Sequence, residues 1–116
     1  MSIYKELVGY LLPEGILDFF ELLNVEKEGV YLHIYLEEKD LLPEEFKDLH
    51  HRSNGFLPAI KVKDFPLREH LVTLHVKQRR WLLVEGNKKV KRNWSLVAPG
   101  TRITVGFASF LKELAG

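Results

Sequence analysis

A helical pattern of apolar residues dominates the start of the chain. Over residues 13–23, PEGILDFFELL, large apolar side chains recur every three or four positions, and Pro13 is favoured in the first turn of a helix. This spacing predicts an amphipathic helix over 13–23, preceded by a shorter helix over 3–11. Asn24 and the charged residues after it mark the expected end.

The next segment changes to a period of two. Residues 30–36, VYLHIYL, place aliphatic side chains on one face and aromatic or imidazole side chains on the other, which predicts a strand. The acidic segment 37–55 follows and predicts a loop, with one helical turn over 43–49.

Strand patterns continue almost to the end of the sequence. Alternation predicts strands over 56–65, 71–84 and 90–97, with the residues EGN at 85–87 as a hairpin turn. Apolar residues at helical spacing then predict a last helix over 101–114, capped by a threonine. The sequence therefore predicts an α+β fold of N-terminal helices, a strand, an antiparallel β-meander and one C-terminal helix.

Length and composition fit one small domain that needs no covalent or metal cross-links. The 116 residues are 46% hydrophobic and 28% charged, so we expect one domain with a single core over 1–116. No cysteine is present, which excludes disulfides, thiolate metal sites and a cysteine nucleophile. No segment resembles a signal peptide or approaches the roughly 20 apolar residues of a membrane span, so we expect a cytoplasmic protein.

The formal net charge of +1 hides a division of the chain into two halves. Residues 1–50 contain 4 Lys or Arg against 12 Asp or Glu, and residues 51–116 contain 13 against 4. One interpretation is that the basic half binds a polyanion. The other is that the two halves attract each other and stabilise one compact domain. Charge alone does not decide between them.

Residue types that carry out catalysis are present but are not arranged for it. The five histidines include the adjacent His50 and His51, and none shows the i, i+4 spacing of a zinc site. The carboxylates predict a solvated acidic surface rather than a paired acid and base. We expect no enzyme activity, no metal and no cofactor. A separate hypothesis is a hydrolase built on clustered carboxylates and histidines, which a loss of binding or activity on metal chelation would support.

The most informative segment combines basic and aromatic residues. Residues 77–94, KQRRWLLVEGNKKVKRNW, contain seven Lys or Arg and two Trp, and the turn folds them into one hairpin. Strand alternation places Lys77, Arg79 and Trp81 on one face, where Lys89 and Lys91 can join them. A two-stranded basic ribbon fits the major groove of DNA. The predicted DNA-binding residues are Lys77, Arg79, Arg80, Trp81, Lys88, Lys89, Lys91, Arg92 and Arg102.

The same hairpin has a purely structural interpretation. Trp81 and Trp94 would then be core residues, and the lysines and arginines would keep an exposed hairpin soluble. For the two tryptophans the core is the favoured interpretation.

Five segments follow one another between Leu11 and Leu114: LLPEGILDFFELL, VYLHIYLEEK, GFLPAIKVKDFPLREHLVTLHVKQRRW, NWSLVAPGTRIT and FASFLKEL. Their order resembles the N-terminal region of split insertion-sequence transposases of bacteria, chiefly Bacteroidetes, in which the next reading frame encodes the DDE catalytic part. The piece DFPLREHLVTLHVKQRRW is similar to the core of a zinc-ribbon domain in a wider transposase family, where a helix-turn-helix follows it.

The resemblance carries over only a few residues. The zinc ribbon of that family uses cysteine pairs, so the resemblance here implies a degenerate ribbon without zinc. Arg79, Arg80 and Trp81 match the RRF-like position, with Asp64 and Pro66 as scaffold. Only the first helix of a helix-turn-helix can be placed, and no member of a DDE triad can be.

The resemblance implies a non-catalytic accessory region that binds the DNA of the element ends through the basic hairpin. It would act with a separately encoded DDE catalytic chain, near the nucleoid, and a homodimer is a further expectation. The alternative is a small protein–protein interaction module, or a transposase remnant without DNA-binding activity. The first hypothesis predicts affinity for duplex DNA, and the second predicts a specific protein partner instead.

Overall fold

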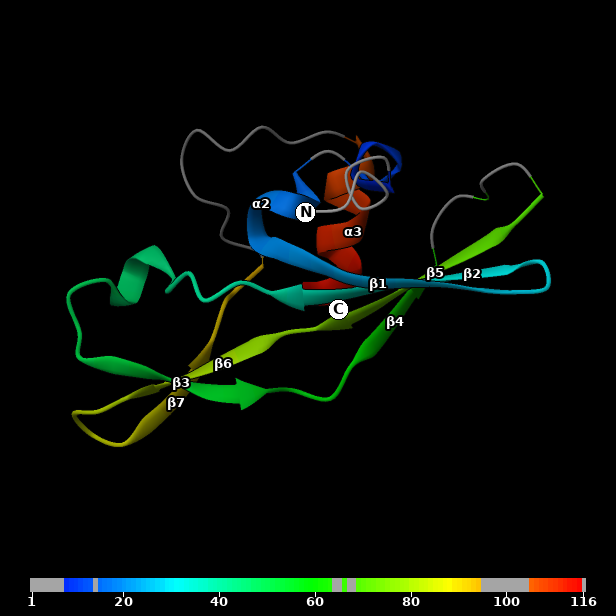
Figure 1. Cartoon of the computed structure of the whole chain (residues 1–116). Helices are drawn as coiled ribbons and strands as arrows, with labels where there is room; N and C mark the ends of the chain where they lie inside the picture. Colours follow the sequence, from blue (N-terminus) through cyan, green and yellow to red (C-terminus); the bar gives the residue numbers. More distant parts are fainter. Residues whose placement is uncertain (1–7, 14, 64–65, 67–68, 95–104, 116) are drawn as a thin grey trace.

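The computed structural model describes residues 8–13, 15–63, 66, 69–94 and 105–115, and it has the α+β fold that the sequence predicts (Figure 1). A helical turn over residues 8–11 comes first. The elements that follow are α2 (Ile16–Phe19), β1 (Phe20–Glu28), β2 (Tyr31–Glu38), the 3-10 helix η1 (Glu44–Phe46), β3 (His51–Phe56), β4 (Ile60–Lys63), β5 (Leu71–Lys77), β6 (Arg79–Leu83), β7 (Lys88–Lys91) and α3 (Val105–Ala115).

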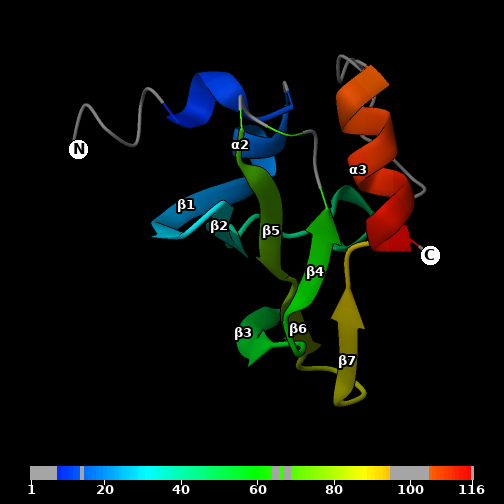
Figure 2. The same ribbon diagram turned by 90° about the vertical axis from the view of Figure 1, so that its right-hand side faces the viewer.

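The larger sheet has four strands in the order β1-β2-β5-β4 (Figure 2). β1 pairs antiparallel with β2, β2 parallel with β5, and β5 antiparallel with β4. One face of this sheet carries Ile34, Leu36, Leu74 and Val76, each at most 1% exposed. The helices cover this face (Figure 1), and Phe110 of α3 joins the same core.

The smaller sheet has three antiparallel strands in the order β3-β6-β7. One of its faces holds a second, smaller core of Trp81, Leu83 and Val90. Leu42 and Phe46 pack against this core from the segment between β2 and β3. We call this segment, residues 39–49, the arm.

The two sheets are joined by one long bent hairpin, in which β3 and β4 run antiparallel to β5 and β6 (Figure 1). The bend lies at Gln78, whose carbonyl oxygen accepts a hydrogen bond from the Leu57 N–H at 2.8 Å. The predicted strand 71–84 is therefore divided into β5 and β6, and of the predicted strand 56–65 the structure has Phe56 at the end of β3 and residues 60–63 in β4. Gln78 is buried, and its side chain accepts a hydrogen bond from the Trp94 indole at 3.2 Å, which satisfies its amide oxygen.

The predicted helix over 13–23 is wrong beyond Phe19. From Phe20 onward the burial alternates, with Phe20 and Leu22 buried and Glu21 and Leu23 exposed, and the segment pairs with β2 as strand β1. The apolar residues in this region fit both the helical period and the strand period of two, so the pattern did not distinguish a helix from a strand. Pairing with β2 satisfies backbone hydrogen bonds along most of this segment, with a bulge at Leu23, and this favours the strand.

The predicted loop over 37–55 is also partly wrong. β2 extends to Glu38 and β3 begins at His51, although residues 51–55 are polar. β3 is an edge strand, exposed along most of its length, so its backbone pairing needs no apolar side chains. The strands of the predicted meander pair antiparallel, and β2, which the sequence placed before the meander, pairs with β5 in parallel.

The C-terminal predictions can be followed only in part. β7 spans Lys88–Lys91, so it overlaps the predicted 90–97 strand only at residues 90–91; residues 92–94 are not in a strand, and residues 95–97 lie outside the described residues. α3 confirms the terminal helix from Val105, while 101–104 are likewise outside the described residues. Among the described residues, no helix has the length and apolar character needed to span a membrane.

Candidate nucleic-acid interface

Four cationic side chains gather on one face of the three-stranded sheet. In the strand register, Leu82 of β6 lies opposite Arg52 on one side and Lys89 on the other. Arg80 lies opposite Lys91. Directly opposed residues in an antiparallel sheet project from the same face. The register therefore places Arg52, Arg80, Lys89 and Lys91 around Leu82, and we call this set the basic face.

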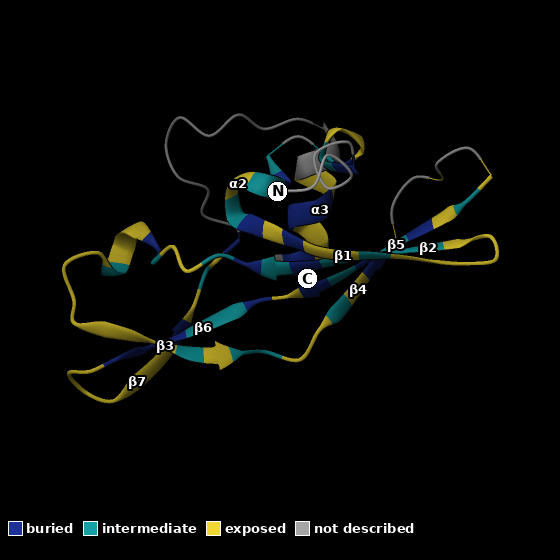
Figure 3. Cartoon of the chain, viewed as in Figure 1, coloured by how far each residue is buried: buried dark blue, intermediate teal, exposed yellow. Residues whose placement is uncertain are grey.

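The basic face is available to a ligand. Arg52, Lys89 and Lys91 are exposed, and Arg80 is half-buried with its Nε donating to the Asn54 carbonyl oxygen at 3.2 Å. Within the described part of the chain, none of the four cations lies within ion-pairing distance of a carboxylate. Figure 3 shows the same sheet with β3 and β7 exposed along most of their length.

Leu82 lies at the centre of the basic face. Its side chain is only 6% exposed, yet it belongs to neither hydrophobic core. Since its direct neighbours across the sheet are Arg52 and Lys89, we infer that the methylene stems of these residues cover it. The stems are then anchored on an apolar residue while the charged ends remain in water.

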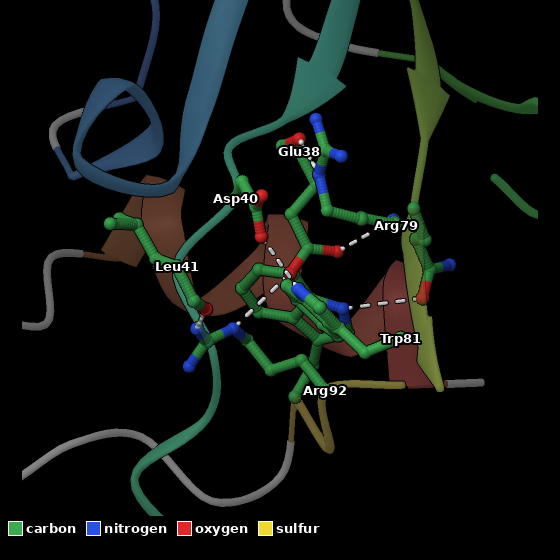
Figure 4. Close-up of polar contacts among 8 residues, drawn as sticks. Glu38, Asp40, Leu41, Arg79, Trp81 and Arg92 are labelled. Atoms are coloured by element: carbon green, nitrogen blue, oxygen red, sulfur yellow. Dashed lines mark hydrogen bonds and ion pairs between the residues drawn. The ribbon is translucent and has the colours of Figure 1, made fainter. Parts of the chain in front are cut away.

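Two of the predicted DNA ligands instead surround a buried glutamate (Figure 4). Glu38, at the end of β2, is 2% exposed. One of its carboxylate oxygens accepts the Arg79 backbone N–H at 3.0 Å, and the other accepts Arg92 Nε at 3.3 Å. Arg79 Nε donates to the Glu38 carbonyl oxygen at 3.1 Å, and its Nη1 donates to Ser53 Oγ at 2.6 Å.

Arg92 is held on several sides. Its Nη2 donates to the carbonyl oxygen of Leu41 in the arm, and its guanidinium lies 5.1 Å from the centre of the Phe19 ring. Its side chain is 12% exposed. We call Glu38, Arg79 and Arg92 the Glu38 network, because these contacts tie the end of β2, the arm and β6–β7 together.

The electrostatics of Glu38 reflect its burial. Desolvation raises the pKa of the Glu38 carboxyl above its usual range, although the Arg79 N–H and the charge of Arg92 act in the opposite direction. The network is therefore an internal structural feature with a desolvation cost, and neither arginine is free to bind a ligand without disrupting it.

Trp81 is also internal. Its side chain is fully buried, and its indole N–H donates to Asp40 Oδ1 in the arm at 2.7 Å (Figure 4). In this structure it has no face on which a base could stack. The structural interpretation of both tryptophans is confirmed, since Trp94 stacks on Phe20 at 5.2 Å in the larger core.

The remaining predicted ligands are scattered. Lys77 is exposed on the four-stranded sheet, so it does not share a face with Trp81, and Lys88 opposes Leu83 on the other side of the hairpin from the basic face. Arg102 lies outside the described residues. Of the nine predicted residues, the structure thus brings together Arg80, Lys89 and Lys91.

The sequence interpretation missed Arg52. This residue lies in a segment predicted as a loop, and only pairing with β6 brings it beside Leu82. A signal was present: an isolated arginine flanked by polar residues that can all be accommodated on an edge strand.

Among the described residues, no group of three or more metal-ligating side chains is placed to hold an ion. Comparison with known proteins gives no match: neither a family model, nor a curated protein, nor a solved structure is significantly similar to this chain. The chemistry of the basic face therefore carries the functional argument.

Proposed function

We propose that this chain binds duplex DNA through the basic face, as a non-catalytic accessory region of an insertion-sequence transposase. The supporting observation is the set of four cations on one face of a three-stranded antiparallel sheet, none of which forms an ion pair with a described residue. The sequence resemblance supplies the biological setting, in which a separately encoded DDE chain performs the reaction. The proposed ligand is the phosphate backbone of the element's ends.

The chemistry of the free cations favours phosphate contact over base recognition. Bidentate arginine contacts to guanine are the commonest specific readout, but Arg79 and Arg92 are occupied inside the protein, and Arg52 is the one exposed arginine of the basic face. Lys89 and Lys91, which are both exposed, act as point charges that suit phosphates. Binding through this face should therefore depend strongly on salt and weakly on sequence.

The test uses the double variant Lys89→Ala with Lys91→Ala. The slope of log affinity against log salt is negative, and each lost phosphate contact reduces its magnitude by about 0.9. We expect the variant to bind a 20-base-pair duplex more weakly, and we expect the magnitude of its salt slope to be smaller by roughly 2. Fluorescence anisotropy titrations at several NaCl concentrations measure both quantities.

The chain contains a matched control. β4 also carries two exposed lysines flanking a valine, Lys61 and Lys63 around Val62, but on the four-stranded sheet. Replacing these two by alanine removes the same charge, and we expect the salt slope to stay within experimental error at protein concentrations below one micromolar. An equal loss in both variants would show a general charge effect and would contradict the basic face as the binding site.

A wild-type chain that fails to bind duplex DNA even at 50 mM NaCl would contradict the proposal as a whole. The interaction-module alternative would then explain the exposed basic face better, as a surface for an acidic protein partner.

A further inference from the structure

The four-stranded sheet has a second face, which we call the outer face, on the side away from the helices. Every described side chain that projects from it is exposed or half-buried, whereas most of those on the opposite face lie in the larger core or pack against it. Figure 1 shows α2 and α3 on one side of this sheet only. The outer face is therefore free in the described structure.

The centre of the outer face is made of rings rather than of charges. His33 on β2 and His75 on β5 share a hydrogen bond, with 2.8 Å between Nδ1 and Nε2. Tyr35 stacks on His75, with 4.5 Å between ring centres and 14° between planes. Farther along the same two strands, Tyr31 opposes Leu71, and these side chains are 49% and 50% exposed. Large apolar surfaces thus line the middle of a solvent-facing sheet.

The charges of the outer face divide by strand. Glu26 and Glu28 project from it on the edge strand β1, opposite His33 and Tyr31. Lys61 and Lys63 project from it on the other edge strand, β4, opposite His75 and Thr73. One edge is acidic, the other is basic, and the rings lie between them.

This arrangement is complementary to itself. We propose that a second copy of this chain docks on the outer face, forming a homodimer about a two-fold axis parallel to the strands between β2 and β5. This rotation reverses the order of the strands in the second copy, so that each acidic β1 faces a basic β4. A two-fold axis across the strands would instead place β1 on β1, with like charges opposed. In the proposed packing the strands are roughly aligned, as in β-sandwiches.

The size of the face sets the expected strength. Four strands about 4.8 Å apart and about six residues long cover roughly 400 Å² per copy, about half of a standard interface. We therefore expect weak, reversible association, populated at protein concentrations of roughly 0.1–1 mM and weakened by salt. Because the strands run the same way in both copies, both three-stranded sheets extend from the same end of the dimer.

The experiment exchanges the charges of one edge at a time. One variant combines Glu26→Lys with Glu28→Lys, and the other combines Lys61→Glu with Lys63→Glu; all four positions are exposed. Sedimentation equilibrium at up to 1 mM should show a wild-type dimer and at least tenfold weaker self-association of each variant. An equimolar mixture of the two variants should associate again, because each edge then meets an opposite charge.

The control reverses two lysines elsewhere, Lys88→Glu with Lys89→Glu on β7, and should leave the dissociation constant unchanged. A wild-type chain that remains monomeric at 1 mM would overturn the proposal. So would variants that associate like the wild type, or a mixture that does not associate. This inference does not rest on DNA binding, and a failure of either proposal leaves the other standing.

Discussion

The position of a single carboxylate determines which arginines of this chain are free. Glu38 lies at the end of β2 and binds the backbone of Arg79 and the side chain of Arg92, both of which the sequence places in a basic hairpin. Nothing in the residues around Glu38 marks it among the many carboxylates of the N-terminal half. Its burial, at 2% exposed, is what distinguishes it.

Removing this carboxylate should cost much more than removing an exposed one. In Glu38→Ala, the Arg79 N–H loses its acceptor and Arg92 keeps a largely buried charge without its partner, so we expect a loss of about 3 kcal/mol. Glu38→Gln retains one acceptor oxygen and should lose less. Urea unfolding measures both, with Glu44→Ala, whose ion pair is exposed, as the control. A loss no larger than that of Glu44→Ala would contradict the network.

The histidine pair predicts a pH dependence of stability. Burial lowers the pKa of His75, and the positive charges of His33 and Lys61 lower it further, while Glu26 acts in the opposite direction. The unfolded chain therefore binds more protons than the folded chain below the ordinary histidine pKa of about 6.5, so stability falls as the pH drops from 7 toward 5.

His75→Gln removes this titration, and its free energy of unfolding should change less over the same pH range. Urea unfolding at several pH values tests the difference between the two proteins, in which the opposite contribution of the raised pKa of Glu38 cancels. Parallel pH profiles would show that His75 does not titrate differently in the two states.

At the scale of elements, the arm both connects the two sheets and covers the smaller core. Its residues Leu42 and Phe46 pack against that core. The arm also accepts a hydrogen bond from the Trp81 indole through Asp40. The arm is acidic in sequence, yet it is held by apolar contacts and by hydrogen bonds from Trp81 of β6 and from Arg92, which follows β7.

Removing the Phe46 ring from the arm should expose Trp81 to solvent. We expect Phe46→Ala to destabilise the protein by about 2 kcal/mol, since Phe46 is only partly buried, and to shift the tryptophan emission to longer wavelength. Leu49→Ala, at an exposed position of the same arm, is the control and should change neither quantity. An unchanged emission spectrum in Phe46→Ala would show that the arm does not shield Trp81.

Two short strands that share a three-residue sequence lie in different surroundings because they pair with different neighbours. β4 and β7 contain the same residues, Lys-Val-Lys, with the valine buried and both lysines exposed. In β7 these lysines join Arg52 and Arg80 on the basic face, whereas in β4 they form the basic edge of the outer face. The sequence pattern is identical, and only strand pairing separates the two environments.

At the scale of the whole molecule, part of the charge asymmetry lies inside the protein and part lies at its surface. Part of it is internal, because Glu38 and Asp40 from the acidic half bind Arg92 and Trp81 from the basic half. The rest remains at the surface, where the basic face has no carboxylate partner among the described residues. The exposed part is the one available for DNA.

The sequence by itself determined the α+β class, the strand β2, the hairpin turn at residues 85–87 and the C-terminal helix. Each depends on local periodicity or on turn chemistry, which a few neighbouring residues specify. It also identified three members of the basic face, because Arg80, Lys89 and Lys91 lie on two strands joined by that short turn.

Only the tertiary structure decided what depends on contacts between distant segments. The change from helix to strand at Phe20 required pairing with β2, and the parallel pairing of β2 with β5 joins residues about forty positions apart. Arg52 joined the basic face, and Arg79 left it, through partners far away in the sequence. Alternation predicts that a side chain projects from a face, but long-range pairing and burial decide what that face meets.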